Sequence, residues 1–203
     1  QRPARILHAV LLAGLNRSAE AIAATESLVA TSESEMERGL FIVQLAMLHE
    51  TIKNYDAARK LYEEALVILP EDFVSLNNLA YLLAEQLNLP QQALPYARRA
   101  VEVSPPAAMS AAMDTLGWIQ AGLGNLDDAI GALTDAVQRD DQYVAARVHL
   151  GEVYRRKGNF EAAADTLTLA KKLIAESRNP TDQALLPSVE ASLQKVQAGD
   201  SGP

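Results

Sequence analysis

Residues 116–130, LGWIQAGLGNLDDAI, decide the fold because they contain a complete helix–turn–helix signal. Three glycines and two acids could also suggest a phosphate loop or a metal site. Gly122 and Gly124 follow an expected helix rather than a strand, and no Gly-Lys-Ser/Thr follows at the spacing of a phosphate loop. A metal site would need further acidic or His ligands beside Asp127 and Asp128. We therefore interpret the glycines as a helix end and the two acids as the start of the next helix.

The same signal recurs along the chain. A Leu followed by a small residue stands at Leu45, Leu79, Leu116 and Leu150, at spacings of 34, 37 and 34 residues. A polar turn follows each of them, and then two alanines seven residues apart. These pairs are Ala58 and Ala65, Ala93 and Ala100, Ala129 and Ala136, and Ala163 and Ala170. Two landmarks in constant phase predict an array of units, each with two amphipathic helices.

The small residues and the turns have physical roles in such a unit. The small residue after each Leu, and the alanines opposite, are expected where the two helices approach closely. Each turn carries a Gly or Asn, a residue able to adopt the left-handed conformation that ends a helix. The turns are Lys53-Asn54, Leu87–Pro90, Gly124-Asn125 and Gly158-Asn159. The 37-residue unit is expected to hold one extra residue in its Leu87–Pro90 turn and two near residues 105–108.

These features resemble the tetratricopeptide repeat (TPR) family. The resemblance implies an all-α fold, a right-handed superhelical solenoid of antiparallel helix pairs. It predicts one array over residues 1–203: a degenerate repeat at 2–35, repeats at 39–72, 73–109, 110–143 and 144–177, a capping helix at 181–197 and a flexible tail at 198–203. Residues 77–86 and 114–118 further resemble bacterial TPR proteins linked to envelope and exopolysaccharide secretion, including the PEP-CTERM type.

Composition excludes several classes of function. The net charge of −8 argues against nonspecific nucleic-acid binding, which needs clustered Lys and Arg. The absence of Cys excludes disulfides and thiolate chemistry, and it suits a periplasmic or a cytoplasmic location equally. No apolar run is long enough to predict a membrane span. Because the sequence starts at Gln1 rather than Met, we expect a piece of a longer protein.

The resemblance places partner-binding residues on the first helix of each unit, on the side that faces the concave groove. By helical phase these residues are Gln44, Met47, Asn77, Asn78, Tyr81, Asp114, Thr115, Trp118, His149, Glu152 and Arg155. Aromatic and amide groups in such a groove suit peptide binding. Asn78 matches the position where an Asn of some TPR grooves holds the main chain of a ligand.

Two of these residues have a second interpretation. Trp118 is either an exposed binding residue or packs onto the next first helix near His149, and His149 is either a partner contact or a neutral surface residue. His8 and His49 are expected in or near the core. The carboxylate clamp of chaperone-binding TPRs is not predicted, because only Asn78 among the corresponding residues fits its pattern.

The sequence therefore predicts a non-enzymatic scaffold that binds a protein or peptide, with no cofactor, no metal and a monomeric state, as part of a bacterial multiprotein assembly. The alternative is a TPR module excised from a larger protein whose catalytic domain, for example a glycosyltransferase, lies elsewhere.

Overall fold

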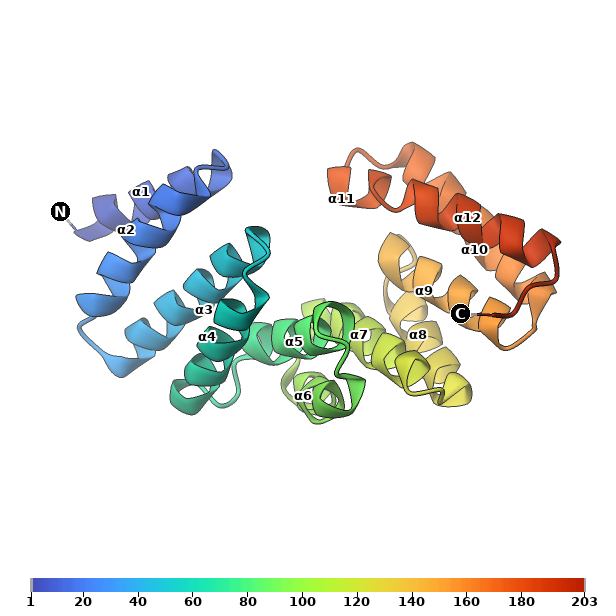
Figure 1. Ribbon diagram of the computed structural model, residues 1–203, viewed down its shortest axis with the longest axis horizontal. Coiled ribbons are helices and arrows are strands. Elements are labelled where there is room, and N and C mark those ends of the chain that lie inside the picture. Colours follow the sequence, from blue (N-terminus) through green and yellow to red (C-terminus); the bar gives the residue numbers. More distant parts are fainter. Residues whose placement is uncertain (1, 203) are drawn as a thin grey trace. The chain divides into compact units, whose positions relative to one another are not determined.

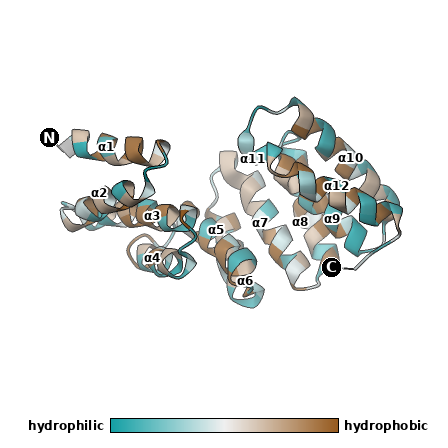
Figure 2. Ribbon diagram, turned by 45° about the horizontal axis from the view of Figure 1, so that its top comes forward, coloured by the Kyte–Doolittle hydropathy of each residue, from teal (hydrophilic) through white to brown (hydrophobic). Residues whose placement is uncertain are grey.

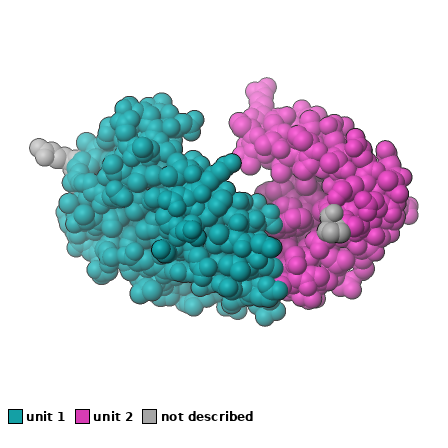
Figure 3. Space-filling model, in the orientation of Figure 1, with its two compact units in different colours: residues 1–103 teal, residues 104–203 magenta. Residues whose placement is uncertain are grey.

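The computed structural model describes residues 2–202, and the chain divides into two compact units, residues 1–103 and 104–203 (Figure 3). The described residues form helices and connecting turns without a β-strand, which confirms the all-α class (Figure 1). No helix in this part of the chain has the length and apolar content that crossing a membrane requires.

Unit 1 is a stack of helix pairs. Its elements are α1 (Arg2–Gly14), α2 (Ser18–Ala30), α3 (Glu35–Thr51), α4 (Tyr55–Ile68), α5 (Phe73–Tyr81), the π-helical turn η1 (Leu82–Gln86) and α6 (Pro90–Val103). Each helix packs against the next one along the chain, from α1 on α2 through to α5 on α6. Ser34 caps α3 by accepting a hydrogen bond from the Glu37 backbone N–H, which satisfies one of the free N–H groups of the first turn.

Unit 2 repeats this arrangement. It contains the 3₁₀ turn η2 (Pro106–Ala108), α7 (Met109–Gly122), α8 (Leu126–Arg139), α9 (Val144–Arg156), α10 (Phe160–Glu176), the short α11 (Pro180–Gln183) and α12 (Leu186–Gln197). Helix α12 packs on α10 and α9, and Val189 and Val196 join the core of the last repeat. Pro187 lies in the first turn of α12, where its missing N–H leaves no helical bond unmade.

Close approach of the two helices in a pair depends on small side chains, as predicted. All eight landmark alanines of the second helices are fully buried. A Cβ added to Gly117 would lie 2.6 Å from Leu133 Cγ, and one added to Gly151 would lie 2.6 Å from Leu167 Cγ. Leu133 and Leu167 fill the space beside these glycines, while the corresponding buried pair in α5 and α6 is Ala80 and Ala97. The bands of apolar and polar residues along single helices in Figure 2 reflect this one-sided packing.

The turns adopt the predicted left-handed conformation, with one difference. Gly124 (φ 82°), Gly158 (φ 80°) and Asn88 (φ 53°) end their helices in this way. In the second pair the left-handed residue is Lys53 (φ 60°), whereas Asn54 (φ −86°) is the N-cap of α4. Position 53 follows the last turn of α3, and Lys53 adopts the left-handed conformation there at a steric cost that Gly would avoid.

The prediction that the extra residue of the 37-residue unit lies in the Leu87–Pro90 turn is wrong. The chain absorbs it earlier, in the π-helical turn η1, where the Leu87 N–H donates to the Leu82 carbonyl over 3.1 Å. π-Helix occurs mostly as such single turns within α-helices, and its wider turn accommodates one additional residue. Pro90 is the first residue of α6.

Candidate functional site

The predicted site residues divide between the two units, and those of α3 border a surface pocket. Gln44 is exposed, and the Met47 side chain is 44% exposed. Both line a pocket of about 270 Å³ in unit 1, together with Val10 and other residues of α1 and with Thr25 of α2. The lining is mainly aliphatic, with polar groups from Thr25, Gln44 and Thr51. Such a pocket can take an apolar side chain and orient the chain that carries it.

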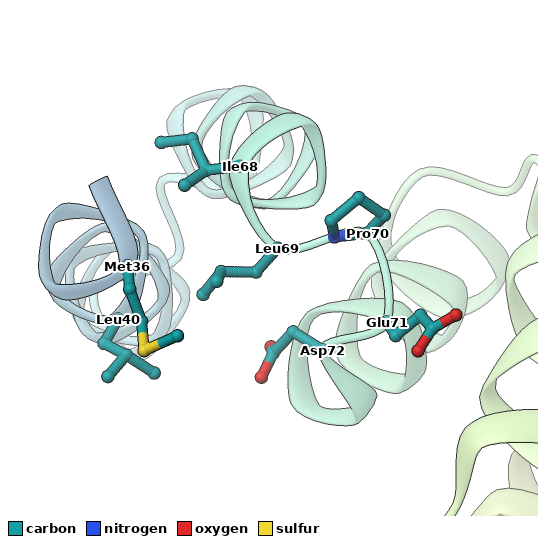
Figure 4. A pocket seen from close by; sticks show the side chains of 7 residues that line it. All are labelled: Met36, Leu40, Ile68, Leu69, Pro70, Glu71 and Asp72. Carbon is teal, nitrogen blue, oxygen red and sulfur yellow. The ribbon is translucent and has the colours of Figure 1, made fainter. Parts of the chain in front are cut away.

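The same face of α3 carries two exposed apolar residues that the sequence analysis did not name. Met36 is 67% exposed and Leu40 is 50% exposed. Together with Met47 they lie at i, i+4 and i+11, which places all three on one line along the helix. Met36 and Leu40 border a second pocket of about 500 Å³, which α4 and the α4–α5 connection complete (Figure 4). In the sequence, the i, i+4, i+11 spacing of these apolar residues is the signal that indicates them.

Asn78 is held in a hydrogen-bond network inside unit 1. Its Nδ2 donates to the Tyr62 hydroxyl over 3.2 Å, and that hydroxyl donates to Glu50 Oε2 over 2.8 Å. Burial raises the pKa of Glu50, and the hydrogen bond from Tyr62 lowers it in part. Burial, together with the nearby Glu50 carboxylate, also raises the pKa of Tyr62. The Asn78 amide therefore makes an internal contact that a ligand main chain would have to share.

The two neighbouring predicted residues on α5 differ from Asn78. Tyr81 is exposed at the end of the helix. The Oδ1 atom of Asn77 is buried and has no hydrogen-bond partner among the described residues.

In unit 2, Trp118 of α7 stacks on His149 of α9. The ring centroids are 4.3 Å apart and the planes differ by 18°. His149 Nδ1 lies 2.7 Å from Asp114 Oδ1, and the Tyr143 hydroxyl donates to Asp114 Oδ2 over 3.3 Å. The packing interpretation of Trp118 is thus confirmed, although its side chain is half-buried rather than enclosed. Asp114 and the neighbouring Thr115 are buried, so neither presents the open surface that the phase of α7 predicted.

Arg155 is fully buried, which contradicts its predicted place on an open surface. Its guanidinium forms a two-pronged ion pair with Glu152, at 2.9 and 2.5 Å, and donates to the Asp200 carbonyl over 2.6 Å. Ser192 of α12 donates to the same Glu152 over 2.9 Å. Burial tends to raise the pKa of Glu152, but the hydrogen bonds from Arg155 and Ser192 and the nearby positive charges lower it overall. This cluster ties α12 and residue 200 to α9.

The histidines and acids of the described chain do not gather into a metal site. No group of three or more such residues in residues 2–202 is placed to hold an ion. His8 is exposed, so the expectation that it lies in or near the core is wrong. His49 is half-buried, with its Nδ1 3.3 Å from Asn54 Nδ2.

Comparison with known proteins identifies the class of repeat. Sequence profiles of the tetratricopeptide repeat match residues 42–69 in unit 1 and residues 115–178 in unit 2. Each unit therefore contains residues that match a tetratricopeptide repeat profile. A search of curated proteins gave no match.

Solved structures share this fold over most of the chain. YrrB, described as a TPR protein with an unusual peptide-binding site, is 25% identical with a TM-score of 0.64, over 83% of this chain and 84% of its own. PilW, a type IV pilus biogenesis factor, has a TM-score of 0.78 at 20% identity, over 97% and 88%. TTC0263, a TPR protein of Thermus thermophilus, has a TM-score of 0.71 at 20% identity, over 96% and 100%. The likeness to PilW and TTC0263 shows the fold alone.

Proposed function

We propose that this chain is a non-enzymatic scaffold that binds a peptide or a helix of a partner protein on the exposed side of its first helices. One observation carries the proposal: Gln44 and Met47 border an aliphatic pocket between α1 and α3. An apolar side chain of a peptide would fill the pocket, and the Gln44 amide could hydrogen-bond to the peptide main chain. YrrB, at 25% identity, is itself described as having a peptide-binding site, which supports this kind of ligand.

The titratable groups of unit 2 support a binding role rather than a catalytic one. Asp114 is hydrogen-bonded to His149, whose ring is stacked on Trp118. Glu152 is paired with Arg155. These contacts fix side chains in place and stabilise the helix packing.

The proposal includes the repeat ranges predicted from the sequence, a monomeric state and no affinity for nucleic acid. It also includes a place in a bacterial multiprotein assembly, which rests on the sequence resemblance to bacterial TPR proteins. Light scattering that shows an oligomer across the accessible concentrations would contradict the monomeric state.

Selection of peptides from a random phage library on the immobilised protein, followed by calorimetry, tests the proposed function. Met47→Glu introduces a charge into the aliphatic pocket and is expected to weaken binding of the selected peptide by about tenfold or more. The matched control is Val67→Glu on α4, because Val67 is 81% exposed and lies outside both pockets. Equal affinities for the two variants, or failure to select any peptide, would contradict the proposal.

A further inference from the structure

The pocket beside Met36 and Leu40 is built by a close approach of α4 to α3. Leu69, at the end of α4, lies over Gly39: a Cβ added to Gly39 would come within 2.8 Å of Leu69 Cδ1 and Cγ. Because Gly39 has no side chain, Leu69 forms a floor between the two helices. Met36 and Leu40 stand on one side of this floor in Figure 4, and Ile68 lies above it.

The charges of this pocket have one sign. Asp72 faces Met36 and Leu40 across the pocket, whereas Glu71 lies at its outer edge with its side chain directed away from them (Figure 4). Glu71 is exposed and takes part in no ion pair or side-chain hydrogen bond among the described residues. Asp72 caps α5 by accepting a hydrogen bond from the Ser75 N–H over 2.8 Å. Two carboxylates beside an aliphatic wall create a negative potential that favours a cationic ligand.

The neighbouring cation does not neutralise this potential. Arg38 lies between Met36 and Leu40 in sequence, but its guanidinium is paired with Glu64 at 2.5 Å and with Glu35 at 3.5 Å. The pocket itself is lined by acidic and apolar residues without a Lys or Arg. Its volume of about 500 Å³ lies within the usual range for ligand pockets.

We propose that this pocket is a second docking site, which binds a partner segment that carries a large aliphatic side chain next to Lys or Arg. The aliphatic side chain lies on Leu69 between Met36 and Ile68, and the cationic group pairs with Asp72. Met36 adapts to the shape of the side chain, because its unbranched thioether chain is flexible. The site is separate from the Gln44–Met47 pocket. It also differs from that pocket because its ligand must carry a positively charged group.

Three synthetic peptides, GSLLKKSG, GSLLEESG and GSAAKKSG, separate the two components of this recognition. The chain has four methionines, at positions 36, 47, 109 and 113, so ¹³C-methyl labelling of methionine gives a signal for each region. We expect GSLLKKSG to shift the Met36 signal saturably, with an affinity about tenfold higher than either other peptide. The signals of Met109 and Met113 in unit 2 should stay unchanged, and added salt should weaken the binding.

Two variants with matched controls link the binding to this pocket. Leu40→Ala shortens the wall, and Asp72→Asn removes the charge but keeps a good helix cap. Both are expected to weaken binding of GSLLKKSG by about threefold to tenfold. The controls Val67→Ala and Asp56→Asn change exposed residues of α4 that lie outside the pocket, and they should bind as the parent does.

Several results would overturn the proposal. They are equal affinity for all three peptides, no shift of Met36 at millimolar peptide, and unchanged binding by both pocket variants. A Met36 signal that moves on dilution without peptide would instead assign the pocket to self-association. A shift of Met47 alone would support the proposed function while contradicting this second site.

Discussion

Leu133 fills the space beside Gly117 in the fourth repeat. Substitutions at these two positions are therefore expected to have non-additive effects on the free energy of unfolding. In Gly117→Ala, the new Cβ would lie 2.6 Å from Leu133 Cγ and 3.2 Å from the Ala129 carbonyl oxygen. Overpacking of this kind costs about 1–3 kcal/mol. Replacement of Gly by Ala inside a helix stabilises the helix by about 1 kcal/mol. The single variant should therefore be destabilised by about 0–2 kcal/mol.

The second single variant and the double variant complete the cycle. Leu133→Ala removes a fully buried side chain and should cost about 2–5 kcal/mol. In the double variant the Ala methyl at position 117 has room, because the Leu133 side chain that it would overlap is gone. The double variant also reproduces the pair Ala80 and Ala97, which the third repeat buries at the corresponding positions.

We expect the double variant to be more stable than the sum of the single effects by about 1–3 kcal/mol. Urea unfolding monitored by circular dichroism gives the three free energies. Unchanged denaturant slopes would show that the variants unfold in the same way as the parent. Additive effects, with a coupling near zero, would refute the claim that Leu133 determines the small residue at position 117.

Three further predictions concern single side chains. Lys53→Gly should stabilise the protein by about 0.5–1 kcal/mol, since Gly adopts the left-handed conformation without strain; a lower free energy of unfolding would contradict this. Glu50→Gln should gain stability relative to the parent as pH rises. Burial raises the pKa of Glu50 in the folded protein, so the parent loses free energy of unfolding as pH rises through that pKa, whereas the Gln variant does not. Thermal unfolding from acidic to neutral pH checks this, and a constant difference between the two proteins would exclude it. Arg155→Ala leaves Glu152 without its buried partner and should cost about 2–5 kcal/mol in urea unfolding, whereas an unchanged midpoint would show that the pair is not needed.

The fold class was predictable because two landmarks repeat in phase. The Leu–small pairs and the alanine pairs determine where two helices can approach, and the turns follow from residues that tolerate a left-handed backbone. The π-helical turn was not predictable, because the spacing of landmarks reveals an extra residue but not its location. A loop and a helix bulge satisfy the same count, and the π-helical hydrogen bonding of residues 82–86 in the structure distinguishes them.

The candidate site was predictable only as far as helical phase determines exposure. Phase correctly placed Gln44 and Met47 on an open face of α3. It failed at Arg155, because the residues that cover its side chain come from a distant part of the chain, including Asp200. It could not choose between the two interpretations of Trp118, since a stack on His149 depends on the distance between α7 and α9.

The central claim is that a partner binds on the exposed side of the first helices, and photocrosslinking tests it most directly. A photoreactive amino acid is placed either at Met47, on α3, or at Val67, on the exposed side of α4. Irradiation with the phage-selected peptide should crosslink the protein through position 47 and not through position 67. Crosslinking through position 67 alone would contradict the claim and assign the binding surface to the second helices.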